Sequence, residues 1–419
     1  MSADADTAWP VQVRGLFPEA PDFLIGRAAA RSPVFAANDA AGGQRVLIGS
    51  AAGTEREDVA RRAAGELLER MHNVLAGHRA VRRAVVASYA ALRRAGRPAL
   101  DPRAWPDLQQ AADVREMEVA WVEGASLTGA GRLLVPAWAV YLAYCPPAGG
   151  AAPLCPGSTG LAAHRTDAAA RRHALLEILE RDLLWHAWYA DGPRLVPCGP
   201  APLGAPLRRV LDALGLRERC VVLPGPAGTA CVVACLSDVD GARQSFGARA
   251  TDGARATDGA RATDGARAAD GALAAAAASA VQEALMVRWS MGTTSARIVW
   301  ARLRADPGHR PRGPLEHALH TFHRQDSLAH LLGGAVESAW RMPSAPPPEA
   351  PEAPEVPELP RLLAGHTGED VVEVPTTAPG LDDDGTAVVR VVAPGARRLP
   401  VDEPPHAASA RPQPPHPLG

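Results

Sequence analysis

The chain of 419 residues contains no lysine, so all 44 of its basic residues are arginines. The absence of a lysine amine excludes a Walker P-loop, a pyridoxal Schiff base and a lysine nucleophile. Any phosphate that the chain binds must therefore be held by arginine, backbone N–H groups or metal ions. A genome that favours arginine codons would explain the missing lysine, and the chemical exclusion holds in either case.

The six cysteines include no Cys-x-x-Cys pair, and this absence argues against a zinc ribbon or a thioredoxin-like site. Cys231 and Cys235 lie in the apolar run 230–236, which predicts a buried strand. A free cysteine in such a strand behaves as a small hydrophobic side chain, so we expect both residues to pack in the core.

Signals for export and for membrane insertion are also lacking. The N-terminal residues have neither the basic start nor the apolar stretch of a signal peptide. No apolar run reaches membrane-spanning length, because the alanine stretch at 272–281 ends at Gln282 and Glu283. The formal net charge of −2 gives no overall field that attracts nucleic acid or an anionic membrane. We expect a cytoplasmic protein with no nucleic-acid or membrane partner.

Hydrophobic residues make up 47% of the chain and charged residues 21%, which is typical of a mainly globular protein. Apolar positions recur at helical spacing over 57–78, 167–189 and 273–291, and Thr166 or Asp167 suits the N-cap of the second helix. Short apolar runs predict strands at 45–48, 133–139, 220–223, 231–236, 371–374 and 387–392. We therefore predict an α/β protein with helices layered on sheets.

A six-residue repeat, Gly-Ala-Arg-Ala-Thr-Asp, covers residues 247–272. A period of six matches neither a helical turn nor strand alternation, and the unit has no side chain large enough to build a core. We therefore predict that the repeat is a mobile surface loop inserted into the core domain.

Proline-rich segments mark two further boundaries. One is a proline/glutamate-rich linker, which we expect to be extended, and the other is a tail near the last residue. The predicted organisation is an N-terminal segment (1–39), a core (40–342), the linker (343–360), C-terminal strands that complete the core domain (361–400) and the proline-rich tail (401–419).

One pentapeptide occurs twice, as Glu-Leu-Leu-Glu-Arg at 66–70 and as Glu-Ile-Leu-Glu-Arg at 177–181. Spacings of three and four residues put both glutamates and the arginine on one face of a helix. The third predicted helix carries Glu283 and Arg288. If the three helices converge, their carboxylates suit magnesium ions that bridge phosphate oxygens, and their arginines neutralise the remaining charge. The alternative is a solvated, salt-bridged helix face.

The order of motifs along the chain resembles the YcaO family. Residues 157–182, which include the second pentapeptide, are similar to the central signature of that family, and Trp185 and Trp188 fit the aromatic residues that follow it. Further similar stretches are 124–136 (the preceding strand pair), 245–247 and 280–288 (the third signature), and 390–395 and 415–419 (the azoline-forming branch). The resemblance covers residues 40–419 and implies a YcaO fold with a proline-rich C-terminal tail.

The resemblance implies an ATP- and Mg2+-dependent cyclodehydratase that acts on a ribosomal precursor peptide. In azoline-forming members, a Cys, Ser or Thr side chain of the peptide attacks the preceding amide carbonyl, and ATP phosphorylates the resulting oxygen. Loss of phosphate leaves a thiazoline or oxazoline ring. A homodimer is also implied. Because the chain has no extra N-terminal domain to bind a leader peptide, we expect a separate ThiF-like or leader-recognising partner protein.

Residue by residue, the resemblance implies three groups of site residues. They are the metal ligands Glu66, Glu69, Glu177, Glu180 and Glu283; the cofactor-binding residues Arg70, Ser158, Thr159, Arg181 and Arg288; and the catalytic tail residues His416 and Pro417. In the tail, His416 or the terminal carboxylate would orient the attacking side chain of the substrate.

Two alternatives to azoline formation remain open. Thioamide formation uses sulfide to attack the same activated carbonyl, and the proline-rich ending argues against it. The other alternative is a degenerate, non-catalytic YcaO scaffold of a modification complex. Four substitutions in the signatures motivate it, because Arg62, Thr159, Ala169 and Met286 stand where the family usually has serine, asparagine, glutamate and glutamine.

A row of histidines lies outside the signatures. His317, His320 and His323 are spaced three apart, so they can lie along one helix face. A zinc site is one interpretation of this spacing, whereas exposed or capping histidines are more common. The segment also resembles an ordinary helix of the family.

Overall fold

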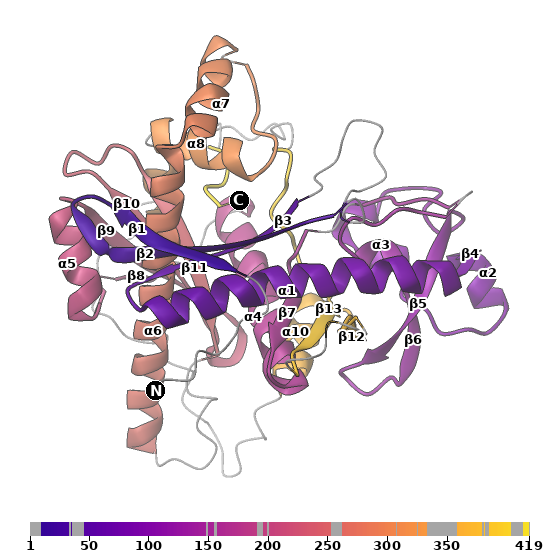
Figure 1. The fold of residues 1–419 in the computed structure, drawn as a ribbon. Coiled ribbons are helices and arrows are strands. Elements are labelled where there is room, and N and C mark those ends of the chain that lie inside the picture. Colours follow the sequence, from indigo (N-terminus) through magenta and orange to yellow (C-terminus); the bar gives the residue numbers. More distant parts are fainter. Residues whose placement is uncertain are drawn as a thin grey trace.

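The computed structural model describes residues 10–32, 35, 46–147, 150–154, 157–190, 196–198, 201–252, 262–306, 308–324, 326–332, 358–378, 381, 385–403 and 414–418. Within these residues, helices alternate with strands that form three antiparallel sheets (Figure 1). The predicted α/β class with layered helices is confirmed.

The first sheet has three strands, in the order β1 (Val11–Phe17), β2 (Ala20–Arg31) and β3 (Val46–Gly53). Helix α1 (Arg56–Ala80) follows β3, packs against β2 and β3, and runs across most of the molecule (Figure 1). Gly49 allows this close packing, because a Cβ at Gly49 would lie 2.1 Å from the carbonyl oxygen of Ala63. The acidic first turn and basic last turn of α1 also suit the helix dipole.

The largest sheet combines segments from both halves of the chain. Its strands run in the order β4 (Val85–Ser88), β5 (Glu118–Ser126), β12 (Val372–Pro375), β13 (Ala387–Val392) and β7 (Leu161–His164), and β6 (Arg132–Pro136) pairs with β5. Strands β5 and β6 form the expected strand pair within 124–136. Because β13 pairs with β7, Arg390 lies opposite Leu161, directly after the central signature turn.

The remaining sheet has four strands, in the order β11 (Ser245–Thr251), β10 (Ala230–Ser237), β9 (Arg217–Pro224) and β8 (Val196–Cys198). Helix α6 (Ala262–Met291) packs against β11 and β10. Every residue of β10 is buried, which confirms the packing role predicted for Cys231 and Cys235.

Helix α4 (Asp167–Tyr189) connects the two larger sheets, since it contacts β7 and β13 on one side and β10 and β11 on the other (Figure 1). The predicted cap is confirmed at Thr166, whose hydroxyl oxygen accepts the N–H of Ala169 at 3.2 Å. Leu175, Leu179 and Trp188 of α4 belong to one buried apolar cluster. Side chains on α4 can therefore reach elements from three distant parts of the sequence.

Shorter helices pack against the sheets and against the long helices. They are α2 (Tyr89–Arg94), α3 (Ala137–Val140), α5 (Ala205–Ala213), α7 (Thr294–Ala305), α8 (Pro314–Arg324), α9 (Ser327–Leu332) and α10 (Leu359–Thr367), with single turns η2 (Val81–Arg83), η3 (Pro102–Ala104), η4 (Pro106–Leu108) and η5 (Pro226–Gly228). The C-terminal end lies close to α4 and α8 in the middle of the molecule (Figure 1).

The prediction of a mobile loop was wrong for the start of the six-residue repeat, which is part of β11. A Cβ at Gly247 would lie 2.2 Å from the carbonyl oxygen of Ala280, so the glycine brings α6 directly onto the strand. On the opposite face of the strand, Ala248 and Ala250 are buried in the apolar cluster that contains residues of α4. Small side chains therefore build a close strand–helix interface here. Helix α6 also begins at Ala262, earlier than predicted, and residues 253–261 lie outside the described residues.

Two smaller predictions also need correction. The strand expected at 133–139 ends at Pro136, because α3 begins at Ala137. The linker expected to extend to Pro360 ends earlier, since Leu359 and Pro360 form the first turn of α10, where proline is well tolerated; residues 333–357 are outside the described residues. Every helix in the described part of the chain is too short or too polar to span a lipid bilayer.

Candidate functional site

The turn before β7 binds Glu177, the first glutamate of the second pentapeptide. The N–H of Gly160 donates to Glu177 Oε2 at 3.1 Å. Gly160 has a φ of +83°, and an added Cβ would lie 2.5 Å from the carbonyl oxygen of Val391, so this turn requires glycine. The half-buried Ser158 and Thr159 directly precede Gly160 in the same turn.

Strand β11 is an edge strand, and two glutamates accept its N–H groups. The N–H of Ala250 donates to Glu180 Oε2 at 3.0 Å, and the N–H of Ala248 donates to Glu283 Oε2 at 2.9 Å. Residues two apart on a strand point their N–H groups to the same side. The carboxylates from α4 and α6 therefore lie along one strand edge, whose backbone donors they satisfy.

Helix α1 brings the first pentapeptide to the same region. Glu66 Oε2 accepts the N–H of Ser50 at 2.6 Å, and Glu66 Oε1 is 2.5 Å from Arg70 Nη2. Arg70 also donates to the carbonyl oxygen of Ile48 on β3. One turn along α1, Glu69 interacts electrostatically with both Glu66 and Glu177, which links the carboxylates of α1 to those of α4.

Burial and mutual repulsion raise the pKa values of these carboxyl groups. Burial raises the pKa of Glu69 well above its usual range, and the charges of Glu177 and Glu66 raise it further. Burial, opposed by Arg181 and assisted by Glu283, raises the pKa of Glu180 to about 7. Burial likewise raises the pKa of Glu177. A bound divalent cation would offset the repulsion between these carboxylates and favour their ionised form.

Two arginines next to the glutamates come from α4 and β11. Arg181 Nε lies 3.7 Å from Glu180 Oε1; burial disfavours its charge, but Glu180, Glu283 and other carboxylates outweigh burial and raise the Arg181 pKa. Arg249 of β11 lies 3.0 Å from a ring nitrogen of His173 and also acts on the charge of Glu180. Together they supply positive charge along the edge of β11.

A third arginine, Arg390 of β13, is only 5% exposed. Burial lowers its pKa to about 10, although the charges of Glu177 and Glu69 oppose that change. One guanidinium nitrogen donates to the carbonyl oxygen of Gly157 at 3.0 Å, whereas Nε has no hydrogen-bond partner. A buried guanidinium with an unpaired N–H is well placed to bind an additional acceptor, such as a phosphate oxygen.

The glutamates predicted as metal ligands thus converge from three helices, which confirms their predicted proximity. Glu180 is buried and the other four are half-buried, so the group is partly open to solvent. Carboxylate oxygens are the ligands that Mg2+ prefers, and guanidinium groups suit phosphate. The residues present therefore fit an ATP–magnesium site. Four of the five carboxylates accept a backbone N–H, which keeps their oxygens in place.

Residues 414–418 of the predicted tail dock close to this site. Trp188 Nε1 donates to the carbonyl oxygen of Pro414 at 2.7 Å, and Leu418, 2% exposed, belongs to the apolar cluster around α4. The ring of His416 stacks on His317 of α8 with centroids 4.0 Å apart, and its Nε2 lies 2.8 Å from the carbonyl oxygen of Pro400. These contacts hold the segment in the interior.

Burial and the nearby charges of His317 and Arg181 lower the pKa of His416 to about 3. The imidazole is therefore neutral at physiological pH. It lies within 4.8 Å of ligand atoms of His317 and of Glu403, whose carboxylate accepts the hydroxyl of Tyr189 at 3.0 Å. Its contacts make His416 an anchor of the tail rather than a group open to solvent.

Comparison with known families identifies this arrangement. Residues 50–397 match the family described as YcaO cyclodehydratase, ATP- and Mg2+-binding. The chain belongs to the YcaO family. The predicted family is confirmed, and the cofactors in its description are the predicted ones. No curated protein matches the sequence.

Solved structures confirm the YcaO fold. A heterocyclase in complex with substrate and cofactor is 17% identical, with a TM-score of 0.59 over 93% of this chain and 50% of that chain. YcaO from Methanopyrus kandleri bound with AMPPCP and Mg2+ is 20% identical (TM-score 0.54, 92% and 85%). The E. coli microcin synthetase McbBCD complex is 13% identical (TM-score 0.55, 94% and 90%). This chain spans half the length of the first of these proteins.

Not every predicted site residue of this YcaO chain lies at the glutamates. Arg288 ion-pairs with Asp238, donates to the carbonyl oxygen of Arg243 and lies over the ring of Phe322. Asp238 holds it at the end of β10, more than one turn beyond Glu283 on α6. Its predicted role in cofactor binding is therefore not supported by its contacts. Arg70 and Arg181 do lie beside the glutamates.

Sequence reasoning missed Arg249 and Arg390 as site residues. Arg390 is the first residue of a stretch that resembles the YcaO family, and this resemblance could have indicated it as a site residue. Arg249 lies in the first repeat unit, where the repetitive composition hid it.

Two of the four positions at which this chain departs from the family pattern, Arg62 and Met286, are engaged in ordinary contacts. Arg62 donates to the carbonyl oxygen of Ala52 at the end of β3, at 2.5 Å, and pairs with Asp58 at 2.8 Å. Met286 packs against the apolar cluster of α6 and β10. Neither side chain displaces a site glutamate from its backbone partner.

Proposed function

We propose that this chain is an ATP-dependent cyclodehydratase that converts Cys, Ser or Thr residues of a ribosomal precursor peptide to thiazolines or oxazolines. The observation that carries the proposal is the convergence of five glutamates from three helices around the arginines of α4, β11 and β13. Such a group suits a magnesium-bound polyphosphate. The family description, ATP- and Mg2+-binding cyclodehydratase, supports it.

The chemistry explains why these residues are sufficient. An amide oxygen is a poor leaving group, and ATP with Mg2+ supplies the phosphoryl group that turns it into a good one. The substrate side chain forms a bond to the amide carbon, and the former carbonyl oxygen departs as phosphate. The protein must hold the peptide and stabilise phosphoryl charge, which requires no lysine. We assign the metal to Glu66, Glu69, Glu177, Glu180 and Glu283, and the phosphate oxygens to Arg181, Arg249 and Arg390.

The tail would position the peptide. Residues 414–418 dock beside Arg181, and the neutral, anchored His416 holds them there. We assign His416 as a positioning residue for the segment that ends in Pro417 and Leu418. The catalytic roles of His416 and Pro417 in the sequence hypothesis stay predictions.

Partners are expected in addition to the precursor peptide. The E. coli microcin synthetase McbBCD, whose fold this chain shares, is a complex, and one of its structures has pro-MccB17 bound. That example supports a separate leader-recognising protein here. The predicted homodimer, the cytoplasmic location and a role in bacteriocin biosynthesis stay predictions.

Calorimetry with AMPPCP and excess Mg2+ tests the nucleotide site. The variant Glu180→Gln should bind at least about tenfold more weakly than the native protein. A matched control, Glu123→Gln, removes a carboxylate that is 71% exposed and paired with Arg132, and it should bind normally. Absence of nucleotide binding by the native, folded protein would instead favour the non-catalytic scaffold.

Mass spectrometry of a candidate precursor peptide tests the reaction. Incubation with this protein, its partner and ATP should remove one water mass for each ring formed. Exchange of oxygen for sulfur would indicate thioamide formation. An unmodified peptide, in the presence of normal nucleotide binding, would reject the proposed reaction and leave the nucleotide site intact.

A further inference from the structure

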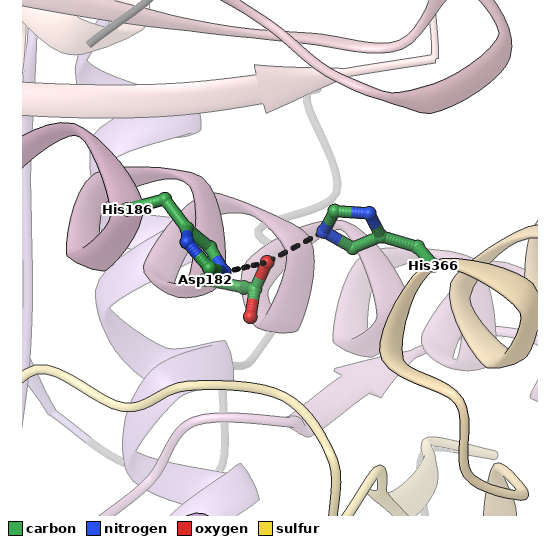
Figure 2. Close-up of side chains that lie close together, drawn as sticks. All are labelled: Asp182, His186 and His366. Carbon is green, nitrogen blue, oxygen red and sulfur yellow. Dashed lines mark hydrogen bonds and ion pairs between the residues drawn. The ribbon is translucent and has the colours of Figure 1, made fainter. Parts of the chain in front are cut away.

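Asp182, His186 and His366 form a compact group outside the glutamate site (Figure 2). Asp182 and His186 are one turn apart on α4, and His366 is on α10. Asp182 Oδ2 is 2.8 Å from His366 Nε2 and 3.8 Å from His186 Nε2. Each imidazole thus faces the same carboxylate oxygen, Oδ2, with its own Nε2 atom.

A backbone group holds the carboxylate in this orientation. The N–H of Arg397 donates to Asp182 Oδ1 at 2.7 Å, which leaves Oδ2 to face the imidazoles. The Asp182 side chain is 2% exposed, whereas His366 is 27% and His186 48% exposed. A fixed, buried oxygen therefore faces two accessible nitrogens. Hydrogen bonds of this kind orient metal ligands.

The ligand types and spacing match a transition-metal dication. Two imidazole nitrogens and one carboxylate oxygen are a common ligand set for Zn2+. Metal–ligand bonds of about 2.1 Å at tetrahedral angles place ligand atoms about 3.4 Å apart. The two observed separations lie on either side of that value, so small rotations of the imidazole rings would complete the geometry. The guanidinium of Arg397 lies over the Trp185 ring, 4.6 Å from its centroid.

An Asp–His hydrogen bond between α4 and α10 is the simpler explanation of the group. It accounts for His366 but not for His186, which lies one turn from Asp182 and faces the same oxygen. The group is also separate from the nucleotide site. At about 100° per residue, Asp182 lies about 200° around α4 from Glu180.

We propose that Asp182, His186 and His366 bind a divalent transition-metal ion such as Zn2+, which links α10 to α4. Helix α10 leads directly into β12, and Arg397 follows β13. Both ends of the β12–β13 hairpin are thus fixed on Asp182, and this hairpin carries Arg390. The metal would stabilise the position of Arg390 without entering the nucleotide site.

Calorimetric titration of untagged protein with Zn2+ tests the proposal. The protein is first stripped with a chelator that is then removed, and excess Mg2+ is present so that the glutamates do not take up zinc. We expect one Zn2+ per chain, with the Kd raised at least about tenfold in His186→Ala and in His366→Ala. The control is His78→Ala, on α1, which should bind as the native protein does.

Two further measurements distinguish coordination by His186 and His366 from nonspecific binding of Zn2+. Co2+ in place of Zn2+ should give visible absorption bands that both histidine variants lose. The melting temperature should rise with Zn2+ in the native protein and in the control, and not in the histidine variants. If the native protein binds no Zn2+, or if both histidine variants bind it as tightly as the native protein, the proposal is wrong.

Discussion

Replacing Glu180 with glutamine should slow ATP turnover and stabilise the fold at the same time. Glu180 is 5% exposed, and burial raises its pKa from 4.5 to about 7. The shift corresponds to at most about 3 kcal/mol of cost for holding the charge above pH 7. Glutamine keeps the oxygen that accepts the Ala250 N–H, and Arg181 retains Glu177 and Glu283 as partners. We expect a net gain of about 1 kcal/mol.

The effect on catalysis should have the opposite sign. Loss of one carboxylate from the metal site weakens the neutralisation of phosphoryl charge, and losses of such electrostatic stabilisation cost roughly 100- to 1,000-fold in turnover. Phosphate release at saturating Mg2+–ATP measures turnover, and urea unfolding at pH 8 without Mg2+ measures stability. The control Glu123→Gln should change neither quantity.

Either of two results would refute this reasoning. Normal turnover in Glu180→Gln would place the site elsewhere or support the scaffold alternative. A variant that is destabilised by more than about 1 kcal/mol at pH 8 would mean that the carboxylate gains more from Arg181 and the β11 N–H than it loses by burial.

Three further predictions concern the tail, the repeat and a buried glutamate. Removal of residues 412–419 should leave Mg2+–AMPPCP affinity near the native value and sharply reduce ring formation; the melting temperature should also fall, because Leu418 is buried, and normal cyclisation would reject a role for the tail. Deletion of residues 253–258 leaves an identical unit to form β11, so melting temperature and turnover should not change, and a fall in either would contradict this. Burial raises the pKa of Glu403 to about 7, so the folded state favours the protonated carboxyl group. The stability gained from this protonation is complete below about pH 4.5 and is lost as the pH rises through 7. Glu403→Gln should therefore be more stable than the native protein at pH 8, by about 1–2 kcal/mol after solvent screening, with no difference near pH 4.5 in urea unfolding; an equal effect at both pH values would contradict this.

The local sequence was sufficient to predict features that depend on a single helix or strand. The pentapeptide spacing placed its glutamates and arginine on one helix face, and the Thr166 cap was predicted because capping depends on neighbouring residues. The family signatures predicted the fold and the cofactors. The convergence of Glu66–Arg70 with Glu177–Arg181 was a hypothesis that the arrangement of α1 and α4 confirmed.

Only the tertiary structure placed the remaining components. Arg249 and Arg390 reach the glutamates because β11 and β13 pack on opposite sides of α4, and no local pattern records such a contact between distant segments. The glycine- and alanine-rich start of the repeat resembled a loop because its side chains are small. It is a buried strand because α6 approaches closely at Gly247 and the cluster around α4 covers Ala248 and Ala250. The group of Asp182, His186 and His366 likewise depends on where α10 lies. The sequence by itself thus determined which residues share a helix face, and packing between elements decided which faces meet.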